Sequence, residues 1–358
     1  MTNYEVLLKG RDHRSLASHF ASLNKKLRGL EEMDGRLKRP SIFSPPLENV
    51  SLSRYTTLGI GGAAPLFYEA RNDAQLKKAI VEAREEGIPF LVMGSGSNLL
   101  VSDRGFQGLV IRDSVEGIKV FRETLRVKGG TLLQELVDFA NRAGRRALEK
   151  MAGIPGTVAG AICGNAGAFG QVISDRLVRV TVFDGRHTLH LLKSECGFTY
   201  RGSVFKKESL VILEAKFRLE KEDPESLSQT SQEILKLRGG KYQEGLKSPG
   251  SFFKNFLVEN LSKEALLKIP PEKIAYGKVP AGYLLEAVGA KGKSLGGVQI
   301  ASYHGNLFLN KAGGTAQEFL ALAREYQIKV REKFGVVLEP EVTLVGFEGE
   351  KSLWPESL

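Results

Sequence analysis

A turn rich in glycine and serine follows an apolar stretch, residues 89–93, that reads as a buried strand. The turn is made of Gly94, Ser95, Gly96, Ser97 and Asn98. Because glycine has no Cβ, such a backbone can turn sharply and present successive N–H groups to an anion such as a pyrophosphate. A Rossmann fingerprint would need a third glycine where Leu99 stands, and the Gly-Lys-Ser/Thr of a P-loop is absent. We interpret the turn as a phosphate-binding loop of another kind, with an ordinary turn between strands as the alternative.

A second segment, Met151 to Ser174, contains no charged residue. Its glycines are Gly153, Gly156, Gly160, Gly164, Gly167 and Gly170. A membrane helix would explain the spacing of four between three of them, but Pro155, Asn165 and a thin apolar content oppose it. Uncharged, glycine-rich backbone suits close contact with a flat, desolvated aromatic cofactor. A tightly packed, glycine-rich turn region is the alternative.

The elements that position the glycine loop form a small α/β unit from Val50 to about Asp113. Residues 66–70 and 109–112 are expected strands, and Asn72 or Asp73 caps a helix that runs to Glu86. A second unit begins with a strand over 118–127 and a helix over 131–143. Next, residues 180–192 predict a hairpin with Asp184-Gly185 as its turn.

Two further strands are expected about a turn near Lys207. If residues 199–205 are extended, Arg201, Ser203 and Phe205 share one face and Tyr200 lies on the other. His187 and His190 lie on opposite faces of their strand, which argues against shared metal ligation, and we expect no metal site. Later helices are predicted over 224–238, 280–288 and 316–334, and a strand-turn-strand near His304.

Composition narrows the class of protein. The 51 Lys plus Arg exceed the 41 Asp plus Glu by 10, but no basic run or nucleic-acid-binding signature occurs, so we expect small anionic ligands rather than nucleic acid. Two cysteines, Cys163 and Cys196, are too few for a disulfide framework. The N-terminus lacks a signal-like apolar core. We expect a cytoplasmic protein without membrane partners. Residues 1–45, with an apolar helical stripe and then prolines, form an arm to which we assign no chemistry.

Several motifs occur in one order, and together they resemble the UDP-N-acetylenolpyruvoylglucosamine reductase family, also called UDP-N-acetylmuramate dehydrogenases. They are TTLGIGG at 56–62, GSGSNLLVSD at 94–103, AGIPGTVAGAICGNAGAFG at 152–170, YRGSVFK at 200–206, GSFFKN at 250–255 and LEPEV at 338–342. The resemblance covers roughly residues 50–347. It implies a compact member of the family that reduces the enolpyruvyl ether of a UDP-sugar with NADPH during peptidoglycan precursor synthesis.

The implied fold is an α/β (α+β) FAD-binding fold of the vanillyl-alcohol-oxidase type. Its expected parts are an arm at 1–45, flavin-binding lobes at 46–115 and 116–222, a substrate-binding domain at 223–325, and a C-terminal helix end and strand at 326–358. The family's FAD site maps onto the glycine loop 94–98 and onto Ala152, Gly153, Ile154, Pro155, Gly156, Thr157, Gly160 and Asn165.

The resemblance also implies the catalytic set Arg201, Ser251 and Glu341. When hydride from flavin N5 adds to the enolpyruvyl methylene carbon, negative charge spreads into the neighbouring carboxylate as an enolate. Arg201 would hold that charge, Glu341 would assist if buried enough to stay protonated or hydrogen-bonded, and Ser251 would deliver the final proton.

Tyr200, Lys254 and Asn255 are expected to bind the substrate. Phe256 departs from the proline common after GSFFKN, which puts the positioning of Ser251 in question. We expect non-covalent FAD, because we identify no His or Cys at a tethering position, and a monomer. The competing functions are another FAD oxidoreductase on this fold, such as a sugar or alcohol oxidase, and a basic binding protein without activity.

Overall fold

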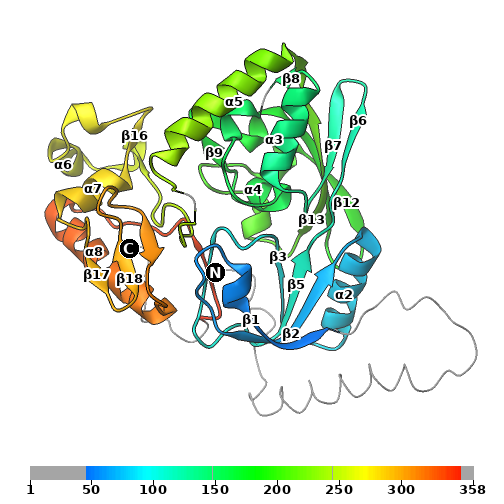
Figure 1. Ribbon diagram of the computed structural model, residues 1–358, viewed down its shortest axis with the longest axis horizontal. Coiled ribbons are helices and arrows are strands. Elements are labelled where there is room, and N and C mark those ends of the chain that lie inside the picture. The colour runs from blue at the N-terminus through cyan, green and yellow to red at the C-terminus, as the bar shows by residue number, and fades with distance from the viewer. Residues whose placement is uncertain (1–45, 147, 244, 348–358) are drawn as a thin grey trace, which may run out of the picture.

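The computed structural model describes residues 46–347 except 147 and 244, so the predicted N-terminal helix lies outside the described residues. The chain builds two sheet-and-helix layers and a third layer beside them (Figure 1). Within the described ranges, no helix is long and apolar enough to span a membrane. The predicted mixture of strands and helices in an α/β (α+β) architecture is confirmed.

The first sheet has the order β1-β2-β5-β3, with β2, β5 and β3 mutually parallel. Its elements are β1 Leu47–Ser51, η1 Leu52–Tyr55, β2 Ala63–Ala70, α2 Asp73–Glu85, β3 Phe90–Met93 and β5 Leu109–Asp113. The α2 helix begins as predicted, because the Asn72 side chain accepts a hydrogen bond from the Gln75 N–H at 2.9 Å. The carboxyl ends of β3 and β5 are neighbours, so the glycine loop that follows β3 leaves the sheet beside Asp113.

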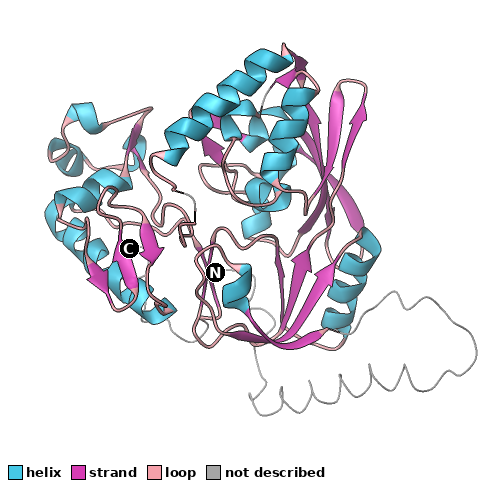
Figure 2. Ribbon diagram, in the orientation of Figure 1, coloured by secondary structure: helices cyan, strands magenta, loops and turns pink. Residues whose placement is uncertain are grey.

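The second sheet is antiparallel, with the order β12-β11-β13-β7-β6. Its elements are β6 Ile118–Phe121, β7 Thr124–Lys128, α3 Leu133–Arg142, β8 Arg145–Arg146, η2 Glu149–Met151, α4 Val158–Cys163, β9 Gly167–Ala168, β10 Gln171–Val172, η3 Ile173–Arg176, β11 Leu177–Phe183, β12 Thr188–Leu192, η4 Lys193–Cys196, η5 Val204–Lys206, β13 Val211–Arg218 and β14 Glu220–Lys221. Helices α3, α4 and α5 (Pro224–Gly239) lie together on one side of this sheet (Figure 2). They share a buried apolar core with it, including Leu136, Ile162, Phe217 and Ile234.

Two predictions for this region are wrong. Residues 118–127 are a hairpin rather than one strand, because Arg122 takes a positive φ of 55° and turns the chain back on itself. Residues 199–205 are not extended, since Arg201 has φ of 57°, Thr199 and Gly202 exchange backbone hydrogen bonds, and Val204–Lys206 is a 3-10 helix. The faces expected for Arg201, Ser203 and Phe205 therefore do not exist.

The elements that follow residue 223, except for α5, form the third layer. They are β15 Phe256–Leu257, η6 Val258–Asn260, α6 Lys263–Leu267, η7 Pro271–Lys273, β16 Lys278–Val279, α7 Ala281–Ala287, β17 Ser294–Leu295, β18 Val298–Ile300, β19 Phe308–Asn310, α8 Ala316–Phe334 and β20 Thr343–Val345. Around Phe252, Phe308 and Phe319 the rings form a cluster with centroid distances of 5.0–5.5 Å. The α5 helix itself packs on the second layer, where Asn141 donates a hydrogen bond to Ser231 at 2.8 Å.

Strand pairing and side-chain hydrogen bonds join the first and third layers. Strand β20 pairs in parallel with β4, Leu99–Val101, so the end of the chain returns to the residues after the glycine loop. The Asp103 carboxylate accepts hydrogen bonds from the first two N–H groups of α8, at 2.8 and 3.0 Å. The Asn310 side chain donates to the carbonyl oxygens of Leu58 and Gly59. The glycine loop and the third layer are thus held in one geometry.

Candidate active site

The glycine loop and the uncharged segment touch each other along one side of a cleft of about 1090 Å³. The Ser97 hydroxyl donates to the Pro155 carbonyl at 3.0 Å, and a Cβ added at Gly156 would lie 2.9 Å from that same hydroxyl. A Cβ on Gly94 would overlap the Thr157 side chain, and one on Gly96, whose φ is +65°, would overlap the Tyr55 carbonyl. These glycines are required by backbone packing before any ligand is considered.

Gly160 and Gly164 are different. Both line the cleft, and neither has a positive φ. A Cβ on Gly160 would meet only the Thr157 hydroxyl at 3.5 Å, and one on Gly164 only the Gly160 carbonyl at 3.6 Å. The fold would accept alanine at either position. The absence of a side chain there therefore leaves space in the cleft that a ligand could occupy.

Most of the predicted cofactor residues line this cleft. They are Gly94, Ser95, Gly96, Ser97, Asn98, Gly153, Ile154, Pro155, Gly156, Thr157 and Gly160. Two others do not: Ala152 is fully buried in the core of the second layer, and the Asn165 side chain donates to the Thr199 carbonyl at 3.0 Å. In the part of the chain that the structure describes, the buried Ser95 hydroxyl has no hydrogen-bond partner. An unpaired buried hydroxyl is costly, so Ser95 is poised to bind a polar ligand.

The predicted catalytic residues Arg201, Ser251 and Glu341 all line the same cleft. Arg201 Nε lies 2.6 Å from Glu341 Oε1, an ion pair by distance although the N–H is not aligned for a hydrogen bond. Ser251 is adjacent through the backbone, because the Glu341 N–H donates to the carbonyl of Phe252 at 2.7 Å. Residues separated by 140 positions in the sequence are thereby brought together.

Arg201 is held by its turn as well as by its partner. A second guanidinium nitrogen, Nη2, donates to the Gly167 carbonyl at 3.1 Å, and Lys206 Nζ donates to the Arg201 carbonyl at 3.0 Å. Both Arg201 and Glu341 expose only about a fifth of their side chains, 22% and 21%. A guanidinium fixed in this way presents its remaining N–H groups to the cleft in a set direction.

Burial changes the acidity of this cluster. The pKa of Glu341 is raised because loss of solvent outweighs the attraction of Arg201 and the nearby lysines. Burial likewise lowers the pKa of Lys206. A carboxyl that resists ionisation beside a permanently charged guanidinium can share or donate a proton more readily than an exposed glutamate.

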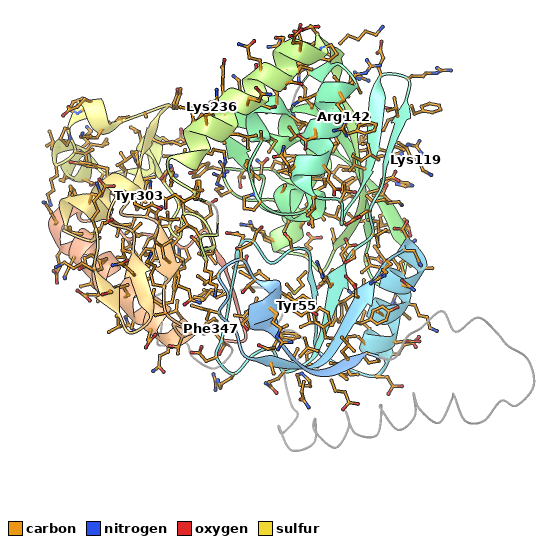
Figure 3. All side chains as sticks on the ribbon, in the orientation of Figure 1. Tyr55, Lys119, Arg142, Lys236, Tyr303 and Phe347 are labelled. Carbon is orange, nitrogen blue, oxygen red and sulfur yellow. The ribbon has the colours of Figure 1, made fainter. Side chains whose placement is uncertain are left out.

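Ser251 has two partners that the sequence did not reveal. Lys241 Nζ donates to the Ser251 hydroxyl oxygen at 3.1 Å, and the Tyr242 hydroxyl lies 3.4 Å from that oxygen. Tyr303, labelled in Figure 3, donates its hydroxyl to the Lys241 carbonyl at 3.1 Å and so holds this loop. A lysine ammonium at this distance from a serine oxygen would stabilise an alkoxide formed there.

The predicted substrate residues all contact other parts of the protein. The Asn255 side chain lines the cleft but accepts the N–H of Ala281, the first residue of α7, at 3.0 Å. Lys254 pairs with Glu339 at 3.0 Å and does not line the cleft. The ring of Tyr200, which also lies outside the lining, has Lys278 Nζ 4.1 Å from its centroid.

Arg238, at the end of α5, lines the cleft but was not predicted to do so. Its guanidinium lies 5.0 Å from the ring of Tyr242, and burial lowers its pKa. Within the described ranges its Nε is buried without a hydrogen-bond partner. Arg238 and Lys241 lie three residues apart at the end of a predicted helix. This pair of positive charges is the sequence signal that could have marked them as candidates for binding an anionic ligand.

Phe256, the departure noted in the sequence, pairs with Val279 in the β15–β16 ladder. A proline there would lack the N–H that such a ladder uses. The position of Ser251 depends instead on Asn306, whose side chain accepts from the Phe253 N–H at 2.9 Å and donates to the Phe253 carbonyl at 2.8 Å. Phe256 therefore leaves the serine segment in place.

Comparisons with known proteins agree with this arrangement. Residues 241–345 match the family described as UDP-N-acetylenolpyruvoylglucosamine reductase, C-terminal domain, and residues 64–192 match the FAD binding domain. A UDP-N-acetylenolpyruvoylglucosamine reductase of Solibacter usitatus is 43% identical over 296 residues, which cover 82% of this chain and 95% of that protein. One of Rubrobacter xylanophilus is 36% identical, covering 87% of this chain and 99% of that protein.

A solved structure is also similar. The UDP-N-acetylenolpyruvylglucosamine reductase of Thermus caldophilus aligns with a TM-score of 0.67 and 33% identity. The alignment covers 85% of this chain and all of that one. The similarity extends across all three layers, and the predicted FAD-binding fold is confirmed.

Proposed function

This chain belongs to the family of UDP-N-acetylenolpyruvoylglucosamine reductases, and from the geometry of its cleft we propose which side chains perform the reduction. The reaction converts the enolpyruvyl ether of UDP-N-acetylglucosamine-enolpyruvate to UDP-N-acetylmuramate with NADPH, a step of peptidoglycan precursor synthesis. The chain is an FAD-dependent oxidoreductase. One observation supports these roles most directly. Arg201, Ser251 and Glu341 all line the cleft that the glycine loop also lines.

The residues on one side of the cleft fit FAD. The loop 94–98 offers backbone N–H groups for a pyrophosphate, the Ser95 hydroxyl has no partner in the described chain, and Gly160 and Gly164 leave room for a flat ring. A cleft of about 1090 Å³ exceeds the roughly 300–1,000 Å³ of a typical ligand site and can hold a large ligand beside a second one. FAD held there would supply the redox chemistry, the transfer of hydride between NADPH and the substrate.

Arg201 stabilises the negative charge that develops on the substrate. Its side chain is fixed by Glu341 and by the Gly167 carbonyl, so it needs little reorganisation when the enolate forms. A fixed guanidinium matches a carboxylate through two parallel N–H groups. Arg201 thus binds the enolpyruvyl carboxylate more tightly as charge moves onto it.

Glu341 acts as a hydrogen-bonding acid beside Arg201. Burial raises its pKa, which favours a shared or retained proton at the carboxyl group. A proton held there strengthens the hydrogen bond to the developing enolate and offsets part of its charge.

Ser251 gives the final proton to the enolate carbon, and Lys241 supports it. The ammonium group 3.1 Å from the serine oxygen stabilises the alkoxide that results. Proton transfer by a positioned group of this kind contributes about 10²- to 10⁴-fold to a rate.

We also propose that the chain works as a monomer in the cytoplasm, where UDP-sugars and NADPH are available. Segment 223–325, with β20, would hold the UDP-sugar opposite the flavin lobes. Size-exclusion chromatography with light scattering tests the oligomeric state, and a dimer mass would contradict it.

The test of the proposed function separates its two half-reactions. The purified protein should be yellow, and NADPH should bleach the flavin absorbance in a stopped-flow instrument. The enolpyruvyl UDP-sugar should then restore the absorbance faster than oxygen does. A flavin that is reoxidised only by oxygen, or a colourless protein that does not bind FAD, would contradict the proposal.

A further inference from the structure

Asn98, the last residue of the glycine loop, makes two contacts with the segment Glu341 to Thr343, which leads into β20. Its side-chain amide donates to the Glu341 carbonyl at 3.1 Å, and its own carbonyl accepts the Thr343 N–H at 3.0 Å. The β4–β20 ladder begins at the next residues, with Leu99 paired to Thr343. The loop and the segment that carries Glu341 are therefore joined where each of them borders the cleft.

The backbone of Glu341 is held on both sides. Its N–H donates to the Phe252 carbonyl at 2.7 Å, next to Ser251, and its carbonyl accepts from Asn98. Fixing both peptide groups of a residue restricts the direction of its side chain, because Cα and Cβ follow the peptide planes. This direction brings Glu341 Oε1 to 2.6 Å from Arg201 Nε.

The amide is the feature that matters at position 98. An aspartate has the same shape, but its carboxylate accepts hydrogen bonds and cannot donate one to a carbonyl oxygen. Alanine leaves the Glu341 carbonyl without this donor, while the Thr343 N–H and the following ladder remain. Substitution of Asn98 therefore loosens one side of the clamp on Glu341 and keeps the strand pairing.

We propose that Asn98 is a positioning residue for Glu341, coupling the glycine loop to the acid that serves the substrate. The inference rests on the proposed function of Glu341. It also differs from our expectation that the Asn98 side chain binds FAD, because that amide is directed at the protein backbone. The role is specific: Asn98 affects substrate reduction and leaves flavin reduction by NADPH unchanged.

The test uses the holoenzyme and the variants Asn98→Ala and Asn98→Asp. Reduction of the flavin by NADPH should stay within about twofold of wild type, and reoxidation by the enolpyruvyl UDP-sugar should slow about 10- to 100-fold, the loss that a small misplacement of a reacting group produces. Fluorescence titration of the apoproteins should give FAD affinities within about threefold of wild type. Asn72→Asp is the matched control, since Asn72 caps α2 through a side-chain oxygen that aspartate retains.

A double-mutant cycle with Glu341→Gln distinguishes positioning from general damage. If Asn98 acts through Glu341, Asn98→Ala should cause little further slowing when Glu341 is already glutamine. The inference about Asn98 would be overturned by additive losses in the cycle, by equal slowing of both half-reactions, or by weaker FAD binding with normal rates in the FAD-loaded fraction. None of these results would contradict the proposed role of Glu341. A Glu341→Gln enzyme with an unchanged rate of reoxidation would overturn the proposed role of Glu341 and the inference with it.

Discussion

Replacement of Gly160 by alanine should change the stability of the protein in opposite directions with and without FAD. Gly160 lies in the first turn of α4 and faces the cleft. A Cβ at this position would be 3.5 Å from the Thr157 hydroxyl, an ordinary contact, and would touch no other heavy atom within 4 Å outside its own helix and chain neighbours. The added methyl group therefore points into space that the protein itself does not fill.

The expected magnitudes follow from these two facts. Without FAD, alanine should stabilise the fold by as much as ~1 kcal/mol, because glycine is the poorer helix former. With FAD, the methyl group would crowd a fitted ring, and overpacking of this kind costs about 1–3 kcal/mol. That cost corresponds to FAD binding about 5- to 150-fold weaker. Each tenfold loss of affinity removes about 1.4 kcal/mol of the stability that saturating FAD provides.

The assay combines chemical unfolding of the apoprotein with fluorescence titration by FAD. Gly239→Ala is the matched control, since a Cβ at this α5 position meets no atom within 4 Å and Gly239 does not line the cleft. It should bind FAD normally. Two results would refute the reasoning: a Gly160→Ala protein with FAD affinity within twofold of wild type, or an apoprotein destabilised by more than about 1 kcal/mol.

Three other predictions concern single side chains. Ser251→Ala should leave flavin reduction by NADPH nearly intact and slow reoxidation by the enolpyruvyl UDP-sugar about 100-fold or more in stopped-flow traces; equal loss in both would make Ser251 structural. Arg201→Lys keeps the positive charge but loses the two parallel N–H groups of the guanidinium, and it should slow the same reoxidation about 10²-fold. An unchanged rate would exclude the guanidinium from charge stabilisation. Burial raises the pKa of Asp113 from 3.8 to about 7, so the native state keeps a proton that the unfolded chain releases, and the free energy of unfolding should fall as pH rises through this range. By pH 8 the wild-type protein should have lost as much as ~4 kcal/mol of its free energy of unfolding in this way. Asp113→Asn keeps the oxygen that accepts the Val115 N–H at 3.0 Å and should not show this loss. The same dependence of the unfolding free energy on pH in wild type and variant, measured by urea unfolding, would contradict this.

Sequence reasoning succeeded where the determining interactions are local. The Asn72 cap, the α3 helix and the Asp184-Gly185 hairpin depend on residues within a few positions of one another, and all three form where they were expected. The glycine loop was recognised because an apolar strand and two glycines are adjacent in the chain. The set of Arg201, Ser251 and Glu341 came from the family resemblance, since each is an ordinary polar residue in its own segment.

Local reasoning failed where one residue changed the backbone direction. Arg122 and Arg201 both adopt positive φ without being glycine, a conformation that their residue type does not predict. Such conformations cost energy in isolation and persist because the surrounding structure supports them. At Arg201 that support is the Lys206 hydrogen bond to its carbonyl and the pairing with Glu341.

Residue types and their order determined the family, and the family resemblance gave the proposed cofactor loop and the proposed reacting side chains. Only the tertiary structure decided that Lys241 donates a hydrogen bond to Ser251, that Asn98 donates one to the Glu341 carbonyl, and that Gly160 borders open space while Gly94 is packed against Thr157. The reason is physical: hydrogen bonds and steric contacts between residues far apart in sequence depend on how completed helices and strands pack, and no short stretch of the chain contains that information.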